Sequence, residues 1–196
     1  MRDKFSRFNR PQLTTCQHRR RLIKLGLGGT AMLLAMPPAF ANLAKLPERK
    51  LSLYNLHTGE QLKTTYWAEG HYQSSELQAI SHILRDHRTN EMIDMDNDLI
   101  DLMTILHRQM QGKQPYHIIS GYRSAKTNEM LRKTGSGGVA KKSFHTLGQA
   151  VDVRLPGRQL TELHEAALKL HAGGVGYYPT SDFLHIDTGP VRQWRG

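Results

Sequence analysis

Apolar residues recur every three or four positions in two segments near the middle of the chain, which is the spacing of an amphipathic helix. The first segment extends from a cap at Ser74 or Ser75 to about Arg85, since serine is a preferred N-cap residue. The second extends from about Asp98 to about Met110. The apolar positions of the two segments are Leu77, Ile80, Ile83 and Leu84, and then Leu99, Leu102, Met103, Leu106 and Met110. We predict two helices whose leucine and methionine faces pack in the core and bind no cofactor.

Short runs rich in β-branched, aromatic and leucine residues predict strands in the rest of the chain. Residues 51–56 and 62–67 flank the turn-prone sequence His57-Thr58-Gly59-Glu60, and this arrangement predicts a hairpin. Further strands are expected at 116–120, 149–155, 173–178 and 183–187.

Two more helices are expected after residues that can cap them, Ser124 and Thr161. Residues 134–143, which follow the first of these helices, are rich in glycine and lysine and predict an exposed loop. Helices that precede and flank strands joined by short connections favour the α+β class. We therefore predict helices packed on a small, mainly antiparallel sheet.

The first forty residues have a different pattern, typical of an export signal. Residues 1–24 are rich in arginine and lysine, an apolar segment follows to Met36, and Ala39-Phe40-Ala41 fits a signal peptidase site. Residues 19–24, Arg-Arg-Arg-Leu-Ile-Lys, are similar to a twin-arginine export signal. We predict a twin-arginine-type signal peptide at 1–41 and one domain at 42–196. An ordinary secretory signal and an uncleaved membrane anchor are the alternatives.

Removal of this segment changes the charge of the protein. The chain has 27 basic and 17 acidic residues, of which eight and one, respectively, lie within 1–41, so 19 and 16 remain. The remaining net charge of +3 removes the main support for nucleic-acid binding, and it is compatible with an anionic polymer such as the cell wall. The single cysteine, Cys16, also lies in this segment. A disulfide framework and a cysteine nucleophile are therefore excluded from residues 42–196.

Three residues in the second half of the chain are candidates for binding a metal ion. His145 ends a loop, Asp152 lies seven positions later in a predicted strand, and His185 lies in a later strand. Two imidazoles and one carboxylate are a ligand set that catalytic zinc uses, with a fourth position left for water. The spacing alone also fits surface or core histidines that bind no metal.

Three motifs resemble those of the D-Ala-D-Ala carboxypeptidase and dipeptidase family of zinc peptidases. Residues 143–152, SFHTLGQAVD, are similar to its Ser-x-His-x-x-Gly-x-Ala-x-Asp string, which supplies two zinc ligands. Residues 120–124, SGYRS, resemble its upstream motif, and residues 183–189, FLHIDTG, resemble the strand that bears the third ligand. Residues 56–60 and 173–178 and the twin-arginine start resemble the periplasmic murein endopeptidase K branch. The resemblance implies one Zn²⁺ per chain, held by His145, Asp152 and His185.

The resemblance also implies a general base near the third ligand and an arginine that stabilises the oxyanion. Asp182 lies three residues before His185, where family members commonly carry the base, and Asp187 lies two residues after it on the same strand face. Each has an alternative, because Asp187 could orient a ligand imidazole and Asp182 could be a solvated turn residue. Arg123 is the expected oxyanion residue, and an arginine that binds the carboxylates of the wall is its alternative.

We therefore predict a metallo-endopeptidase of the periplasm that hydrolyses the peptide cross-links between peptidoglycan stem peptides. A D,D-carboxypeptidase that trims terminal D-Ala and a non-catalytic peptidoglycan-binding module with a structural metal are the alternatives. The expected partner is peptidoglycan, without nucleic acid and without a stable membrane anchor after signal cleavage.

Overall fold

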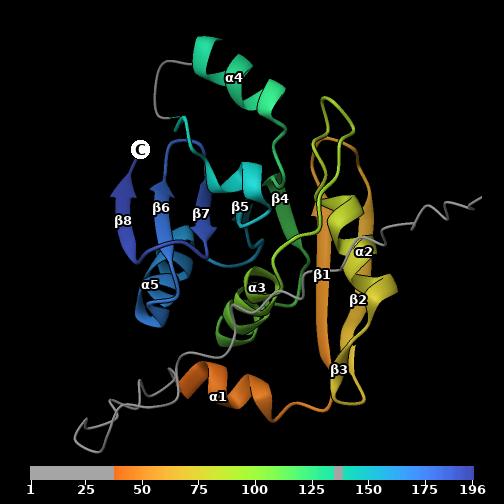
Figure 1. Cartoon of the computed structure of the whole chain (residues 1–196). Coiled ribbons are helices and arrows are strands. Elements are labelled where there is room, and N and C mark those ends of the chain that lie inside the picture. Colours follow the sequence, from red (N-terminus) through yellow and green to blue (C-terminus); the bar gives the residue numbers. More distant parts are fainter. Residues whose placement is uncertain (1–37, 135–138) are drawn as a thin grey trace, which may run out of the picture. The chain divides into compact units, whose positions relative to one another are not determined.

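The computed structural model describes residues 38–134 and 139–196, and its strands in this part form one eight-stranded sheet (Figure 1). The strands are β1 (Arg49–Asn55), β2 (Gln61–Ala68), β3 (His71–Tyr72), β4 (Tyr116–Ser120), β5 (Ala150–Arg154), β6 (Gly174–Tyr178), β7 (Phe183–Asp187) and β8 (Arg192–Arg195). The helices are α1 (Pro38–Ala44), α2 (Ser74–Ile83), α3 (Asn97–Gln109), α4 (Ala125–Thr134), α5 (Leu160–Leu170) and the 3₁₀ turn η1 (Phe144–Leu147).

The strand order across the sheet is β3-β2-β1-β4-β5-β7-β6-β8. Neighbouring strands are antiparallel except for the pairs β1/β4 and β6/β8, which are parallel. The predicted α+β class and the mainly antiparallel pairing are confirmed. The sheet is larger than predicted, because the short edge strands β3 and β8 have too few residues to produce a periodic pattern.

The core lies between the sheet and the helices α3 and α5. Helix α3 packs against β1 and α5, and α5 packs against β6 and β7. The predicted apolar face of α3 is buried, with Leu99 and Met103 fully inaccessible to solvent. Burial of such side chains is the main stabilising contribution to a fold of this size. Helix α5 covers one face of β6 and β7, and the polar residues described below project from the other face.

The helix starts agree only in part with the predicted caps. Ser124 caps α4 as predicted, because its hydroxyl accepts a hydrogen bond from the Thr127 amide at 3.2 Å. The predictions for α2 and α5 are wrong: the N-cap residues are Gln73 and Gln159, and neither makes a side-chain cap hydrogen bond. Both helices are instead held by their packing on the sheet, which decides more helical stability than the cap does.

The predicted signal peptide lies outside the described residues up to residue 37. Its predicted end, after Ala41, falls within α1, whose Leu43 is buried and which packs against α3. Within residues 38–134 and 139–196, the helices all fall short of the length and apolar character that crossing a bilayer demands.

Candidate metal centre and active-site pocket

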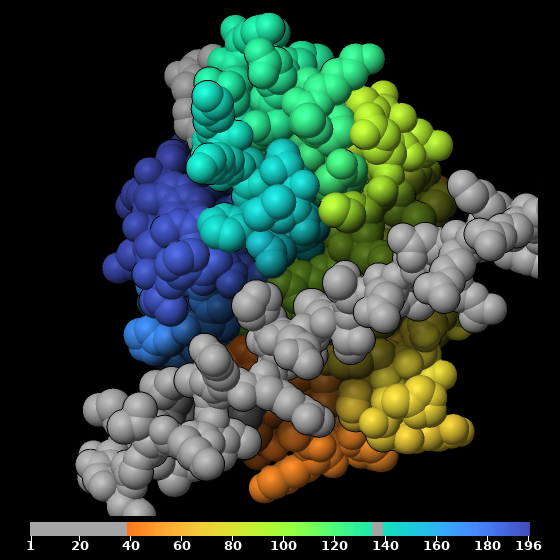
Figure 2. All heavy atoms as spheres, in the orientation of Figure 1, coloured from red at the N-terminus to blue at the C-terminus, as the bar shows by residue number. Residues whose placement is uncertain are grey.

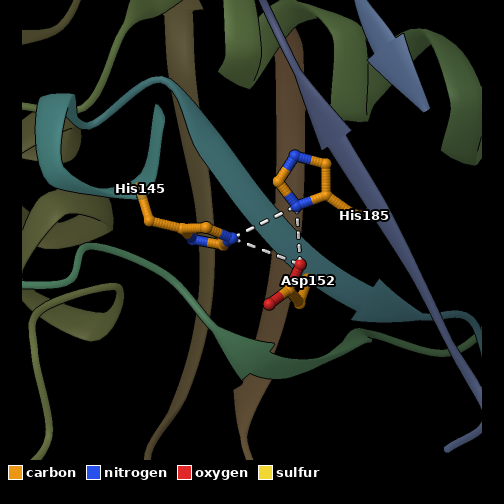
Figure 3. Close-up of side chains that lie close together, drawn as sticks. All are labelled: His145, Asp152 and His185. Atoms are coloured by element: carbon orange, nitrogen blue, oxygen red, sulfur yellow. Dashed lines mark hydrogen bonds and ion pairs between the residues drawn. The ribbon is translucent and has the colours of Figure 1, made fainter. Parts of the chain in front are cut away.

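The side chains of His145, Asp152 and His185 point toward one another, from η1, β5 and β7 (Figure 3). His145 Nε2 is 3.2 Å from His185 Nδ1 and 3.3 Å from Asp152 Oδ1. His185 Nδ1 is 2.8 Å from the same Asp152 oxygen. All three residues are buried, and the three motif residues predicted to meet do converge on one point.

The elements that carry these residues explain why they converge. Asp152 on β5 pairs directly with His185 on β7 in the antiparallel register, so both side chains project from the same face. His145 reaches them from η1, which ends at Gly148 in a left-handed conformation with φ of 69°. A Cβ atom at residue 148 would lie 2.8 Å from the Asp94 carbonyl oxygen, so the turn that delivers His145 requires glycine.

Hydrogen bonds behind the two imidazoles determine which ring nitrogen faces the cluster. His145 Nδ1 lies 2.7 Å from the Gly121 carbonyl oxygen, which can only accept, so Nδ1 donates and the lone pair of Nε2 points to the cluster. His185 Nε2 lies 2.9 Å from Asp187 Oδ2, and His185 Nδ1 points to Asp152. Metal-binding histidines typically have such a partner on their second nitrogen.

These contacts bring three acceptor atoms together, and such an arrangement needs a positive charge between them. Ligands about 2.0–2.1 Å from a tetrahedral zinc ion lie about 3.3 Å from one another, and the observed separations of 2.8–3.3 Å are close to that value. Among the described residues, these three form the group that could hold a metal ion. The side chains therefore fit a divalent cation with room for a further ligand.

The pKa shifts within the cluster have the same physical origin. Burial raises the pKa of Asp152, but the imidazoles of His145 and His185 outweigh burial and hold this pKa well below its usual range. Burial lowers the pKa of His185, but hydrogen bonds to Asp152 and Asp187 outweigh it and raise this pKa to about 8. The surrounding carboxylates thus favour a positive charge at the centre of the cluster.

A cavity of about 490 Å³ opens over the cluster. Its lining residues are Arg123, Val139, Ala140, Lys142, Ser143, Phe144, His145, Asp152, Tyr178, Phe183, His185, Arg192 and Trp194. They come from segments far apart in the sequence, and in Figure 2 the segment around η1 (cyan) borders the C-terminal strands (blue) on one side. The walls are basic and aromatic, and Asp152 is the one acidic residue among the described lining residues.

Asp187 lies behind His185 and has no exposed surface. Its oxygens accept hydrogen bonds from the amides of Gly174 and Gly189, from His185 Nε2, and from both terminal nitrogens of Arg192 at 3.0 and 2.6 Å. Burial raises the pKa of Asp187, but these hydrogen bonds and the His185 charge outweigh burial and lower it. The geometry does not support the predicted role as general base, because all its acceptor positions are occupied and it faces the distal nitrogen of His185. Its contact with His185 Nε2 is the one expected under the alternative stated above, in which it would orient that imidazole.

Asp182 does not reach the cavity over the cluster. It lies in the turn before β7 with φ of 52°, and its side chain is 60% exposed. Its carboxylate pairs with Arg154 Nη1 at 3.1 Å, beside a second hollow of about 300 Å³. In this position its carboxylate is engaged by Arg154 and does not line the cavity, so the role of Asp182 as the base stays a prediction.

Arg123 lines the cavity, as its predicted role requires. Its Nη2 is 3.8 Å from Asp152 Oδ2, and its remaining contacts to Ser120 and Asn128 are long, at 3.4 Å each. Its buried Nε has no hydrogen-bond partner among the described residues. Burial lowers the pKa of Arg123, but a guanidinium keeps its charge in proteins. The positively charged guanidinium of Arg123 is thus largely buried, and its N–H groups make only long hydrogen bonds or none within the described residues.

The C-terminal strand β8 contributes residues that the sequence did not predict. In the register, Gly176 lies between His185 and Trp194, and Gly174 lies beside Arg192. A Cβ atom at residue 176 would be 2.6 Å from the Trp194 ring, and one at residue 174 would be 2.4 Å from Arg192 Nη1. The two glycines therefore let both side chains lie across β6 towards the metal cluster. The alternating glycines in Gly-Val-Gly-Tyr-Tyr and the spacing in Arg-Gln-Trp-Arg were the available signals.

Comparisons with known proteins find relatives that match most of the chain. A family model described as peptidoglycan L,D-endopeptidase MepK matches residues 44–194. The protein named "Peptidoglycan L,D-endopeptidase MepK" from Escherichia coli (strain K12) is 46% identical over 179 residues, which cover 90% of this chain and 97% of that protein. "Probable peptidoglycan L,D-endopeptidase MepK" from Haemophilus influenzae is 38% identical over 175 residues, covering 88% and 94%. No solved structure was found to match the chain.

The matched region includes all three motifs on which the resemblance to the zinc peptidases was based. Nearly the full length of both relatives is covered, so the likeness is to whole proteins and not to an isolated motif. The chain therefore belongs to the peptidoglycan L,D-endopeptidase MepK family, the murein endopeptidase K branch of the M15-type metallopeptidases.

Proposed function

We propose that this chain is a zinc-dependent murein endopeptidase that hydrolyses L,D amide bonds in the peptide cross-links of peptidoglycan. The observation that carries the proposal is the convergence of His145, Asp152 and His185 beneath a cavity of about 490 Å³. The bond type comes from the names of the E. coli and H. influenzae relatives. The endopeptidase activity agrees with the prediction made from the sequence.

Zinc is the metal we propose for the cluster, with one ion per chain. Two neutral imidazoles and one carboxylate are a common ligand set of catalytic zinc and leave a fourth position for water. A zinc ion held there would polarise the scissile carbonyl and lower the pKa of water towards neutrality. A structural zinc site normally has four protein ligands, and the group found in the described residues has three. This count favours the enzyme over a non-catalytic module.

Arg123 is the residue we propose for stabilising the negative charge that develops on the scissile carbonyl oxygen. A guanidinium in a largely buried setting interacts strongly with such a charge, because little water screens it. The unpaired Nε and the long contacts of both terminal nitrogens leave donors available for the substrate. Asp187, in contrast, holds His185 from behind and is itself held by Arg192.

We also propose that the protein acts in the periplasm after export by the twin-arginine route. The support is the pattern of residues 1–41 and the peptidoglycan named as the substrate of the relatives. Fusing residues 1–41 to a reporter and assaying a strain that lacks the twin-arginine translocase tests the route. Unimpaired export in that strain would reject it.

The test of the activity is digestion of isolated murein sacculi by the purified protein, with released fragments identified by mass. We expect cleavage of cross-linked fragments, loss of activity in chelator and recovery on addition of zinc. Cross-linked dimers and uncross-linked pentapeptides should be digested in parallel, because release of terminal D-Ala alone would identify a D,D-carboxypeptidase. Cleavage that persists in chelator would reject the zinc mechanism, and sacculus binding without any cleavage would identify a binding module.

A further inference from the structure

Tyr178 ends β6 at the edge of the cavity, and its neighbour Tyr177 lies on the other face of the strand. Side chains alternate along a strand, and the structure follows this rule. Tyr178 lines the cavity over the metal cluster, whereas Tyr177 stacks on His164 of α5 and lies under Arg195. Two adjacent tyrosines therefore share a strand and differ in whether they face the reacting centre.

Two contacts fix the position of the Tyr178 phenol. Its ring stacks on Phe183, with centroids 4.4 Å apart and an interplanar angle of 16°. Its hydroxyl oxygen lies 2.9 Å from Trp194 Nε1. The ring is thus held in place before any substrate binds, which is the condition for efficient electrostatic catalysis.

The contact with Trp194 also determines what the hydroxyl can do. An indole N–H can only donate, so the Tyr178 oxygen accepts this hydrogen bond and its own proton is free to be donated elsewhere. Among the described residues, no acceptor receives that proton. Tyr178 and Arg123 both line the cavity over the cluster, so it holds two donors that can face a bound substrate.

The residues that line the cavity include hydrogen-bond donors and one acidic residue, Asp152. The two carboxylates expected to serve as the base do not face the cavity, and no second acidic residue lines it in the described part of the chain. A neutral hydroxyl that donates without ionising suits an oxygen that becomes negatively charged. Resting on the proposed function, we propose that Tyr178 is a catalytic residue whose hydroxyl donates a hydrogen bond to the oxygen of the scissile carbonyl. It shares with Arg123 the stabilisation of the developing charge, and no proton is transferred.

The test compares Tyr178→Phe with Tyr177→Phe, which removes the same atom from the opposite face of the strand. We expect Tyr178→Phe to lower kcat on a cross-linked muropeptide dimer by about 100-fold, the usual loss for one oxyanion donor, with KM little changed. Bound zinc and thermal stability should match the wild type. Tyr177→Phe should keep the wild-type kcat. Trp194→Phe, which frees the hydroxyl to rotate, should give a smaller reduction.

A second readout is independent of turnover. A phosphinate analogue of the dipeptide bond mimics the charged tetrahedral centre, and calorimetry should show that Tyr178→Phe weakens its binding by a factor similar to the loss in kcat. Wild-type kcat and wild-type analogue affinity in Tyr178→Phe would overturn the inference, and so would a loss of kcat that merely follows loss of zinc or unfolding. Wild-type protein that neither cleaves the dimer nor binds the analogue would instead reject the proposed function, and the role of Tyr178 with it.

Discussion

Two groups of buried polar side chains lie on opposite halves of the sheet, and they differ in where their polar atoms point. In the first, Asp101 of α3 accepts hydrogen bonds from Arg49 Nη1 at 2.7 Å, from Tyr66 at 2.8 Å and from Tyr72 at 2.9 Å. In the second, acceptor atoms of His145, Asp152 and His185 face one another beneath a cavity. Both groups contain a buried aspartate, and the second lines a cavity of about 490 Å³.

The direction in which the polar atoms point distinguishes the Asp101 group, which has the features of a structural cluster, from the group of His145, Asp152 and His185, which has the features of a binding site. Around Asp101 every acceptor meets a donor, and the guanidinium of Arg49 also lies over the Trp67 ring at 4.1 Å. Arg49 Nε is the one buried donor of this group without a hydrogen-bond partner among the described residues. A group whose acceptors are all paired contributes to a unique fold and offers a cation no free lone pairs. At the metal cluster, the outer nitrogen of each imidazole donates to an acceptor, the Gly121 carbonyl or the Asp187 carboxylate, and the inner side is left with converging lone pairs. That imbalance costs stability unless a cation is present, which is the property expected of a binding site.

The largest expected effect comes from breaking the metal cluster. Asp152→Asn removes the negative charge that two imidazoles share, so the affinity for zinc should fall sharply. We expect hydrolysis of muropeptides to fall by more than 100-fold, beyond the roughly 10–100-fold cost of losing only a supporting residue. Zinc content by mass spectrometry and a circular dichroism spectrum check the cause. A variant that keeps both zinc and activity would show that Asp152 is not a ligand.

The matching change in the closed cluster should affect stability and leave chemistry intact. Asp101→Asn leaves the buried Arg49 charge without its partner, and loss of one member of a buried pair costs about 3 kcal/mol or more. Urea denaturation should show this loss, while zinc content and kcat of the folded protein stay at wild-type levels. Glu48→Gln, which breaks the exposed pair with Lys50, is the control and should have little effect. A loss of zinc in Asp101→Asn would contradict the separation of the two clusters.

Weakening the contact between Arg192 and Asp187, which lies behind His185, should have an intermediate effect on zinc affinity. Arg192→Lys cannot reproduce the bidentate contact with Asp187, so His185 should be held less firmly. We expect zinc affinity, measured by competition with a chelator, to fall about 10-fold. Arg195→Lys is the matched control, because Arg195 lies on the same strand and contacts Tyr177 on the opposite face. Equal zinc affinities in the two variants would remove Arg192 from the site.

The sequence predicted the residues of the metal cluster and missed those of the Asp101 cluster, for physical reasons. Long segments with a clear period, such as α3, and motif-bearing strands, such as β5 and β7, were correctly predicted because their patterns are local. Strand β8 was missed, since it is four residues long and mostly exposed, yet it carries Arg192 and Trp194 to the site. The closed cluster was missed as well, because Asp101 lies on a helix and Arg49 on a strand 52 residues away.

The base assignment shows a further limit of sequence reasoning. Strand alternation correctly placed Asp187 on the face of His185, but it could not show that Arg192 and two backbone amides already occupy its oxygens. The direction of Asp182 depends on a left-handed turn and on Arg154 of another strand. Both outcomes arise from contacts between distant segments, which no window of local sequence contains.

The smallest expected effect concerns a pair of histidines outside both clusters. His57 and His87 stack with ring centroids 3.8 Å apart. Burial, followed by the nearby charges of His57 and Arg88, lowers the pKa of His87 to about 4 from its usual 6.5, against the opposing influence of Asp86. Above pH 6.5 the ring is neutral in both the folded and the unfolded chain. Below it the unfolded chain takes up a proton first, so stability should be lost as the pH falls from 6.5 to 4.

His87→Phe tests this contribution, because phenylalanine keeps a flat ring for the stack and has no titrating group. The free energy of unfolding should be measured by urea denaturation at several pH values between about 8 and 4 for both proteins. We expect the wild type to lose stability more steeply than the variant between pH 6.5 and 4, and the two curves to run parallel above pH 7. Parallel curves over the whole range would show that the stacked ring titrates as it does in the unfolded chain. Because metal ligands also take up protons in acid, both proteins should be compared after chelation, which removes the zinc-dependent contribution from the difference.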